Sequence, residues 1–479
     1  MPPSRGLGVL HYLGLILMVV GVALFVPLGI AAAFAELDVP LLLSFAIPAA
    51  IIFTSGFFAA RLIPPREIDV RMAIMLSALI WAFIPLLGAI PYMLIQGMSF
   101  IDSYFEGMAG FTTTGLTMIT DVESLPRSLQ FWRTLTEWLG GVGVILLFLS
   151  ILVEAGTVSV RLYRAEARTD RISPTIVGTV RRIWWIYVGF TVTWILLLWG
   201  AGMPLFEAIN HGMTAIATGG FSVKNQSIGA YNDSLLEALV ILGMIVGTIS
   251  FATHYHVFRG KLSKLYRSSE VQFMLLAILS GTLLIAFSMI LRDGYAVLDG
   301  FRYAIFHVVS AISTTGFKIM DLSTLDPFSR TFLILLMIMG GGYGSTAGAM
   351  KLIRVITILK FLIWSVRRFF LPRGAVPALE IDGEPVEDSQ LFEALRFMAL
   401  YVILLFAGTM AMTALGYNLA DALFDVTSAQ GNVGLSVGVA SPSMHPLGKI
   451  VFIVEMWAGR LEILPVLLVF VYALRGVKD

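Results

Sequence analysis

Long apolar segments recur along almost the whole chain, and polar residues are concentrated in the connections between them. Ten segments of about 20 residues or more have no polar face, so lipid or neighbouring helices must solvate their side chains. The membrane-spanning helices predicted from this pattern cover residues 7–33, 39–62, 72–96, 130–153, 182–202, 234–258, 271–291, 329–366, 391–415 and 448–474. The pattern therefore predicts an all-α polytopic membrane protein.

Four connections contain a second, shorter kind of apolar stretch. Each is about ten residues long, too short to cross a hydrocarbon layer of ~30 Å. Each runs into a Gly/Thr/Ser-rich turn before the next spanning helix begins. We interpret these stretches as re-entrant half-helices at residues 101–111, 205–217, 297–313 and 419–429. The predicted unit is a helix, a half-helix, a polar glycine turn and a second helix.

The four turns can be aligned with one another. They read Thr113-Thr114-Gly115-Leu116-Thr117, Thr218-Gly219-Gly220-Phe221-Ser222, Thr314-Thr315-Gly316-Phe317-Lys318 and Asn432-Val433-Gly434-Leu435-Ser436. The third position is always glycine, and successive glycines are 105, 96 and 118 residues apart. Such spacing is typical of a duplicated unit.

Irregular backbone at membrane depth is tolerated only where it is buried in protein or lines a water-filled cavity. One such turn could be an ordinary glycine turn, but four around one axis favour a pore. A ring of backbone carbonyls can replace the hydration shell of a monovalent cation. The turns contain no Asp or Glu, which favours K⁺ or Na⁺ over Ca²⁺.

Two other functional classes remain as alternatives. The first is a secondary carrier for another small solute, which works by alternating access and is marked by inverted repeats with two broken helices. The second is a membrane enzyme, which would need clustered Asp, His and Glu at one membrane face. The six histidines form no such cluster in the sequence. No enzymatic activity is therefore predicted.

Composition and charge refine this picture. Charged residues make up 13% of the chain, against about 25% in soluble domains. The net charge of +1 provides no field for binding nucleic acid. Of the 32 Lys and Arg residues, 22 lie near the two termini or in four connections, at residues 61–71, 161–182, 259–267 and 351–373. The positive-inside rule then places both termini in the cytoplasm.

One predicted spanning segment contains five glycines in nine residues, at 340–348. Glycine at this density breaks a helix, although a flexible kink or a helix-packing notch is an equal alternative. The candidate gate residues in and after this segment are Gly340, Gly341, Gly342, Gly344, Ser345, Thr346, Gly348 and Lys351.

Two cationic side chains stand out. Arg460 lies within the last apolar segment, where a charge is costly and usually functional. Glu455 and Glu462 are off its helix face, so we expect its partners to come from another repeat. Lys318 occupies the last position of its turn, where the other three turns have a hydroxyl residue. It either repels cations at the outer mouth or turns away towards Asp321.

Glu137 lies five or more residues into the fourth predicted helix. We expect it to face the outer vestibule or to pair with Arg133, four residues earlier on the same helix.

These turns, the two additional N-terminal helices, the stretch 340–348 and Gly459-Arg460-Leu461-Glu462 resemble the TrkH branch of the Trk/Ktr/HKT potassium transporter superfamily. The resemblance spans essentially the whole chain. It implies that potassium is the transported ion and is coordinated by backbone carbonyls of Thr113, Thr114, Gly115, Thr218, Gly219, Gly220, Thr314, Thr315, Gly316, Asn432, Val433 and Gly434.

The resemblance also implies a fold, a gate and partners. Four pseudo-fourfold helix–half-helix–helix repeats would surround a central pore, with a glycine-rich intramembrane loop and Arg460 below the filter. The protein would lie in the lipid of the cytoplasmic (inner) membrane as a homodimer on a TrkA-like cytosolic ring of nucleotide-binding regulatory subunits. We expect residues 1–65 to form the N-terminal extension and residues 66–157, 158–260, 261–372 and 373–479 to form the four repeats.

Overall fold

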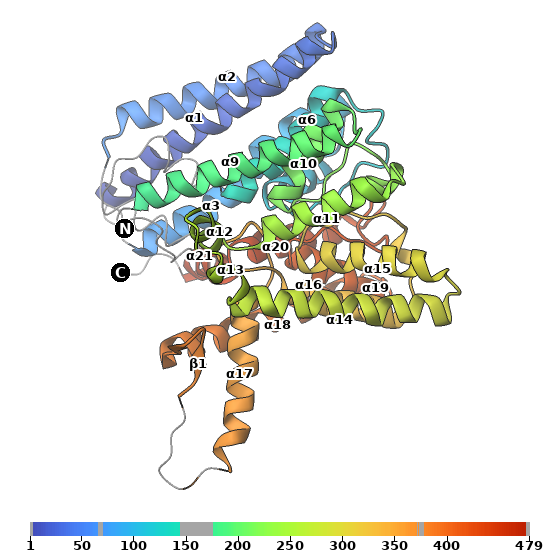
Figure 1. The fold of residues 1–479 in the computed structure, drawn as a ribbon. Coiled ribbons are helices and arrows are strands. Elements are labelled where there is room, and N and C mark those ends of the chain that lie inside the picture. Colours follow the sequence, from blue (N-terminus) through green and yellow to red (C-terminus); the bar gives the residue numbers. More distant parts are fainter. Residues whose placement is uncertain (1–2, 66–69, 144–175, 371, 373–377, 476–479) are drawn as a thin grey trace.

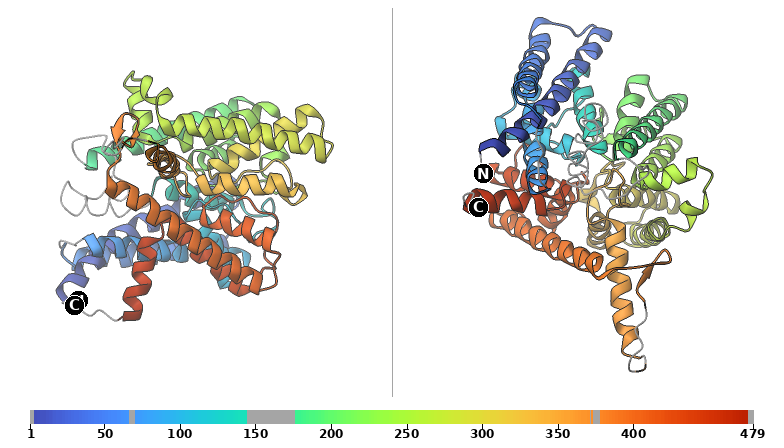
Figure 2. Two further views of the ribbon diagram at one scale, coloured as in Figure 1. Left: turned by 90° about the horizontal axis from the view of Figure 1, so that it is seen from below. Right: turned by 90° about the vertical axis from the view of Figure 1, so that its left-hand side faces the viewer.

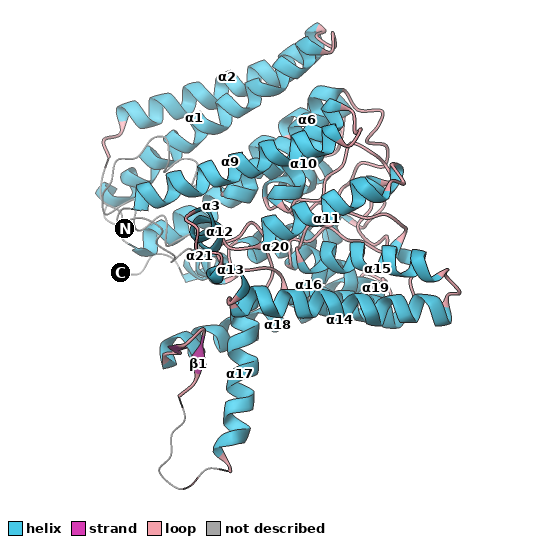
Figure 3. Ribbon diagram, in the orientation of Figure 1, coloured by secondary structure: helices cyan, strands magenta, loops and turns pink. Residues whose placement is uncertain are grey.

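The computed structural model describes residues 3–65, 70–143, 176–370, 372 and 378–475, and these are mostly helical (Figure 3). Helices α1 (Pro3–Ala33) and α2 (Val39–Leu62) form an antiparallel pair along one edge of the molecule (Figure 1). The described residues contain one small sheet, the antiparallel pair β1 (Glu380–Ile381) and β2 (Glu384–Pro385). The predicted N-terminal two-helix extension is thus present as a separate hairpin.

Four similar units follow this hairpin. Each contains a long first helix, a half-helix and a further helix. The first helices are α3 (Val70–Gly88, continued by α4, Ile90–Gln96), α9 (Ile176–Gly200), α14 (Ser269–Arg292) and α18 (Asp388–Ala414). The half-helices are α5 (Phe100–Phe111), α10 (Leu205–Ala217), α15 (Val297–Ile312) and α19 (Leu419–Gln430). The further helices are α6 (Arg127–Val142), α11 (Ser234–Thr248), α16 (Pro327–Met339) and α20 (Pro446–Arg460).

The units follow one another around a common centre in sequence order (Figure 2). The further helix of each unit packs against the half-helix of the next: α6 on α10, α11 on α15, α16 on α19 and α20 on α5. The last of these pairs closes the circle. The observed arrangement confirms the predicted pseudo-fourfold helical fold, and the half-helices end within one residue of their predicted bounds.

Side chains at the N-termini explain where several helices begin. The Asp38, Asp233, Asp326 and Asn418 side chains accept hydrogen bonds from the first-turn amides of α2, α11, α16 and α19. Pro327 is the first residue of α16, where its missing N–H has no cost. Such caps satisfy amides that have no partner inside the helix.

The prediction of ten spanning helices was wrong in part. The described residues contain six helices that are long and apolar enough to span a membrane, or seven if the bent pair α11 and α12 (Phe251–Phe258) counts as one. The pair bends by 101° at Ile249 and Ser250, inside the predicted helix 234–258. The predicted helix 448–474 is likewise broken between α20 and α21 (Leu464–Arg475). Part of the predicted helix 130–153 lies outside the described residues.

The remaining elements lie between or beyond these helices. They are α13 (Ser263–Tyr266), α17 (Leu352–Arg368) and the 3-10 turns η1 (Ser227–Ala230) and η2 (Leu322–Thr324). Helix α17 projects away from the helical body, with β1 beside it (Figure 1). Helix α17 therefore lies outside the ring of the four units.

Glycines set how closely the units approach one another. A Cβ on Gly140 of α6 would overlap the carbonyl oxygen of Phe111, at the end of α5. A Cβ on Gly459 of α20 would overlap that of Gln430, at the end of α19. Phe111 and Gln430 both lie four residues before a predicted filter glycine. The close approach of these helices therefore fixes the positions of the half-helix ends, and only glycine permits it.

Candidate functional site

The four predicted filter turns follow the C-terminal ends of the four half-helices and meet one another. A Cβ added to the glycine of each turn would overlap a backbone carbonyl oxygen of the next turn: Gly115 on Gly219, Gly220 on Thr315, Gly316 on Val433 and Gly434 on Thr114. Because the fourth turn contacts the first, these contacts close a ring. The structure brings together all four predicted segments, although successive segments are about a hundred residues apart in the chain.

The four turns also share one backbone conformation. The first residue of each turn has a positive φ: 56° at Thr113, 51° at Thr218, 54° at Thr314 and 53° at Asn432. The glycine has a positive φ as well, between 72° and 102°, whereas the residue between them does not. Three of the four leading residues are β-branched threonines, for which this conformation is costly. The surrounding protein therefore imposes the conformation.

Side chains at the first position bond to neighbouring protein groups. The Thr113 and Thr218 hydroxyls donate to the carbonyls of Thr112 and Ala217, both over 2.7 Å. The Asn432 side-chain amide donates to the Thr114 hydroxyl at 3.0 Å and to the Met456 carbonyl at 2.9 Å. These bonds hold the turns in place without using the turns' own carbonyl oxygens.

The carbonyl oxygens of the turns lack protein partners. Within the described part of the chain, none of the twelve carbonyl oxygens at 113–115, 218–220, 314–316 and 432–434 accepts a hydrogen bond. Most of these residues are buried. Buried carbonyls are almost always paired, so a cluster of them without donors indicates a site for an electropositive ligand. Carbonyl oxygens suit a weakly hydrated monovalent cation.

A polar side chain lies nine residues before each filter glycine, a feature that was not predicted from the sequence. The four residues are Glu106, His211, His307 and Asp425, one on each half-helix. The constant spacing of these residues from the glycine is a signal in the sequence. It is hard to recognise because the four residues are of three different chemical types.

These four side chains hold the segments that follow the glycines. The Asp425 carboxylate accepts bonds from the Ser436 hydroxyl at 2.6 Å and from the Val437 and Ala440 amides at 2.8 Å. His307 Nε2 accepts from the Ile319 amide at 3.3 Å. The third and fourth units thus anchor the chain beyond the turn to their own half-helix.

The first two units repeat this anchoring with different groups. The Glu106 carboxylate accepts from the Met118 amide at 2.9 Å and from the Thr117 hydroxyl at 2.9 Å. His211 Nε2 lies 2.9 Å from the Ser222 hydroxyl. In both histidines, Nδ1 bonds the carbonyl four residues earlier, which leaves Nε2 as an acceptor.

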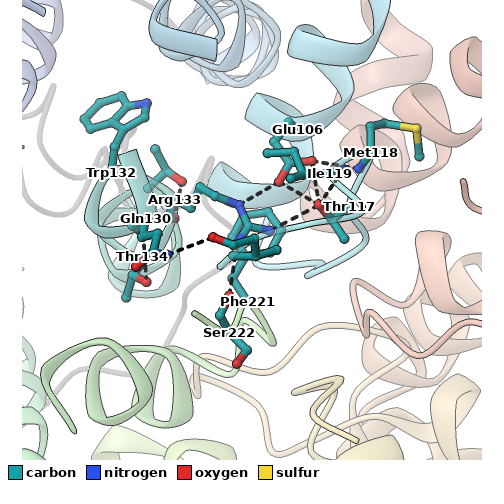
Figure 4. A network of polar contacts seen from close by, with 12 residues as sticks. Glu106, Thr117, Met118, Ile119, Gln130, Trp132, Arg133, Thr134, Phe221 and Ser222 are labelled. Atoms are coloured by element: carbon teal, nitrogen blue, oxygen red, sulfur yellow. Dashed lines mark hydrogen bonds and ion pairs between the residues drawn. The ribbon is translucent and has the colours of Figure 1, made fainter. Parts of the chain in front are cut away.

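Arg133 on α6 joins the first two turns (Figure 4). Its Nε lies 2.8 Å from Glu106 Oε1, and the two side chains are 2% and 0% exposed. Its Nη1 donates to the Ser222 carbonyl at 3.1 Å, and its guanidinium lies 4.0 Å from the centre of the Phe221 ring. This buried ion pair therefore connects neighbouring units.

Glu137 was expected to face the outer vestibule or to pair with Arg133, and both expectations were wrong. Glu137 is fully buried. It accepts bonds from the Thr214 hydroxyl and the Phe221 amide, both at 2.9 Å. The partner of Arg133 is Glu106, 27 residues away, because α5 and α6 face each other across the turn.

The filter glycines border a cavity of about 320 Å³, which we call the vestibule. Gly115, Gly220, Gly316 and Gly434 line it together with residues that follow each turn, including Lys224, Lys318 and Asp321. Lys318 and Asp321 thus share one cavity, but no described carboxylate lies within 4.0 Å of the Lys318 ammonium group. The vestibule therefore lies directly against one side of the ring of carbonyls.

The glycine-rich segment lies on the opposite side of the ring. Helix α16 ends at Met339 and α17 begins at Leu352, so the helix is broken where the glycine density predicted a break. The Gly348 amide donates to the Thr314 hydroxyl at 2.8 Å, directly behind the third turn. The Thr346 hydroxyl donates to the carbonyls of Ile216, at 3.0 Å, and Gly247, at 2.8 Å. We call residues 340–351 the glycine-rich loop.

The same loop explains the unexpected break between α11 and α12. The Gly342 amide donates to the Thr248 carbonyl at 3.0 Å, and the Phe251 amide donates to the Gly344 carbonyl at 3.2 Å. Carbonyls and amides that would continue one helix therefore bond the loop instead. The Lys351 ammonium group donates to the Ala347 carbonyl and so folds back onto the loop.

Arg460 is the last residue of α20, and its side chain reaches other units, as expected. Its guanidinium donates to the Thr113 hydroxyl at 3.4 Å, the Thr346 carbonyl at 3.2 Å and the Gly141 carbonyl at 3.3 Å. It thus contacts the first turn, the glycine-rich loop and α6. Arg460 and several loop residues together line a small cavity of about 40 Å³.

The chain is similar in sequence to known cation transport proteins. The sequence model of the TrkH family, described as a cation transport protein, matches residues 46–475. The chain is 36% identical over 464 residues to an uncharacterized cation transporter of Methanocaldococcus jannaschii, covering 97% of this chain and 95% of that protein. It is 32% identical over 476 residues to the Trk system potassium uptake protein TrkH of Halomonas elongata, covering 96% and 98%.

A solved structure has the same fold. The crystal structure of the potassium transporter TrkH from Vibrio parahaemolyticus superimposes with a TM-score of 0.87 at 23% identity, covering 97% of this chain and 98% of that one. The apolar helices and these relatives together indicate a multi-pass membrane protein and a transporter rather than an enzyme. The chain belongs to the TrkH family of cation transport proteins.

Proposed function

We propose that this protein takes up potassium ions across the cytoplasmic membrane through the ring formed by the four turns. The observation that carries the proposal is the cluster of twelve carbonyl oxygens without protein donors, arranged in a closed ring. Such oxygens replace the hydration shell of K⁺, and no carboxylate in the turns favours a divalent ion instead. Relatives named as potassium uptake proteins support the choice of ion.

In this proposal the vestibule faces the outside and both termini lie in the cytoplasm. The coordinating groups are the backbone carbonyls at 113–115, 218–220, 314–316 and 432–434. The five unit boundaries expected from the sequence, beginning at residues 1, 66, 158, 261 and 373, describe the extension and the four repeats. Potassium is the transported substrate.

The glycine-rich loop and Arg460 form the barrier in this proposal. The loop lies against the third turn through Gly348 and against the second unit through Thr346. The guanidinium of Arg460 places a positive charge beside the first turn, which disfavours a cation there. Permeation requires the loop to move. A cytosolic nucleotide-binding regulatory subunit bound to a homodimer would control this movement.

The test compares two glycine-to-alanine changes in purified protein reconstituted in liposomes. Gly316→Ala places a Cβ onto the Val433 carbonyl and strains a residue with a φ of 81°. Gly189→Ala, in α9, meets nothing within 4 Å and is the matched control. We expect potassium flux to fall at least tenfold in the first variant and to stay within twofold of wild type in the second. Equal flux in all three proteins would contradict the filter assignment.

A further inference from the structure

The residue two positions after the filter glycine differs between the units. In three units it is a hydroxyl residue that bonds the side chain nine residues before the glycine: Thr117 with Glu106 at 2.9 Å, Ser222 with His211 at 2.9 Å and Ser436 with Asp425 at 2.6 Å. In the third unit it is Lys318, and His307 binds the Ile319 amide instead. The anchoring of the third turn therefore does not use the Lys318 side chain.

The backbone of Lys318 is nevertheless fixed. Its amide donates to the Ser227 hydroxyl at 3.3 Å, and its carbonyl accepts from the Gly229 amide at 3.2 Å. Both partners belong to η1 of the second unit. The main chain thus holds the side chain at the wall of the vestibule, beside the filter glycine Gly316.

Nearby carboxylates compensate the charge of Lys318 less than they compensate the charges of the other cationic side chains that line the same cavity. Lys224 lies 3.1 Å from Glu207 and 3.7 Å from Glu123, and Arg133 is paired with Glu106. Lys318 has no carboxylate within 4.0 Å among the described residues. The pKa of Asp321 is lowered, mainly by the Ser323 amide and in part by the charge of Lys318, so the ammonium acts on its surroundings at longer range.

We propose that Lys318 is a specificity-determining residue whose ammonium group excludes divalent cations from the vestibule while K⁺ still enters. The inference rests on the proposed potassium uptake. A fixed positive charge opposes each entering ion in proportion to the ion's own charge. The positive charge therefore costs Mg²⁺ or Ba²⁺ twice the free energy that it costs K⁺. The factor by which it weakens binding of the divalent ion is the square of the factor for K⁺.

The test replaces Lys318 by residues that separate charge from shape. Lys318→Met keeps the length and removes the charge, Lys318→Arg keeps the charge, and Lys318→Ser restores the hydroxyl of the other units. Potassium flux through reconstituted protein is measured against K⁺ concentration, and then against Mg²⁺ or Ba²⁺ added to each side in turn. Lys264→Ser, on the exposed helix α13, is a control for the loss of one charge elsewhere.

We expect the Met and Ser variants to lower the half-saturating K⁺ concentration about threefold, as one charge at ~6 Å in water would do. At K⁺ concentrations well below half-saturation, the concentration of divalent cation that halves the flux should fall about tenfold, the square of that factor. Both shifts should shrink near 1 M ionic strength, where the Debye length is about 3 Å. Lys318→Arg and Lys264→Ser should behave as wild type.

Several outcomes would overturn the inference. Equal shifts for K⁺ and for the divalent ions, or no shift in Lys318→Met, would exclude a charge effect. A shift in Lys318→Ser alone would assign the effect to a hydrogen bond with His307. A wild-type protein that carries no potassium would instead contradict the proposed function, so the two failures are distinguishable.

Discussion

The two sides of the carbonyl ring are built differently. On the vestibule side, every unit anchors its own turn through the residue nine positions before the glycine, so the support is repeated four times. On the other side, the support comes mainly from the glycine-rich loop of the third unit and Arg460 of the fourth. The symmetric side suits a rigid coordination site. The asymmetric side suits a part that moves, because one segment can leave without dismantling the four anchors.

The largest expected effect concerns the symmetric side. Arg133→Met leaves Glu106 as an unpaired buried carboxylate, which should lower the free energy of unfolding by about 3–5 kcal/mol. Denaturation of the purified protein in mixed micelles measures the change. The double variant Arg133→Met/Glu106→Gln should lose less than Arg133→Met alone, since no charge is left unpaired.

The matched control for that experiment is a partly exposed pair. Arg330 and Asp421 lie 3.0 Å apart, with 24% and 38% of their side chains exposed. Arg330→Met should cost about 1 kcal/mol or less, because solvent screens such pairs. Similar losses for Arg133→Met and Arg330→Met would mean that the pair between the first two turns has no special structural role.

An intermediate effect is expected on the asymmetric side. Thr346→Val removes the hydroxyl proton that the carbonyls of Ile216 and Gly247 share, and with it a tie between the loop and the second unit. At about 1 kcal/mol for this shared bond, the loop should leave its closed position roughly fivefold more readily. Single-channel recording or liposome flux should show a higher open fraction with unchanged ion selectivity.

Thr357→Val is the control for the loop variant. The Thr357 hydroxyl is also buried, but it bonds the Ile353 carbonyl within its own helix, α17. The Thr357→Val variant should therefore leave potassium flux unchanged. If Thr346→Val lowered the flux or altered the selectivity, the loop would belong to the filter scaffold rather than to a movable part.

The smallest effect is expected from pH at the vestibule. The pKa of Asp321 is lowered, first by the hydrogen bond from the Ser323 amide and also by Lys318. A lowered pKa keeps the carboxylate charged above its usual value of about 4, and the charge is lost only as the pH falls below that value. Potassium affinity should therefore stay constant between pH 5 and 8. A wild-type titration in that range that is absent from Asp321→Asn would contradict this.

Much of the fold could be predicted from the sequence because its signals are local. The length of the apolar stretches separates spanning helices from half-helices, and the turn residues repeat in register. The half-helix α10 begins and ends at its predicted residues, 205 and 217. The five glycines of 340–348 also predict the helix break where it occurs.

The features that could not be predicted depend on distant partners. Helix α11 ends at Thr248 because the amide of Gly342, 94 residues later, bonds its last carbonyl. The break after Arg460 occurs where Glu462, with a φ of 60°, lies 2.5 Å from Arg354 of another unit. The predicted partner of Arg133, Glu137, was wrong for the same reason. A rule based on helix spacing considers only residues of one helix, whereas Glu106 lies on another.

The closed ring of turns has a consequence for how this site can change. In a pore assembled from four identical chains, every mutation alters all four quadrants together. Here one continuous chain supplies four different quadrants, so a substitution changes a quarter of the ring and leaves three quarters intact. Asn432 in place of threonine, and Lys318 in place of a hydroxyl residue, are single-quadrant changes of this kind. Such a pore can acquire a single charge or a single amide, whereas the same substitution in a pore of four identical chains would introduce four.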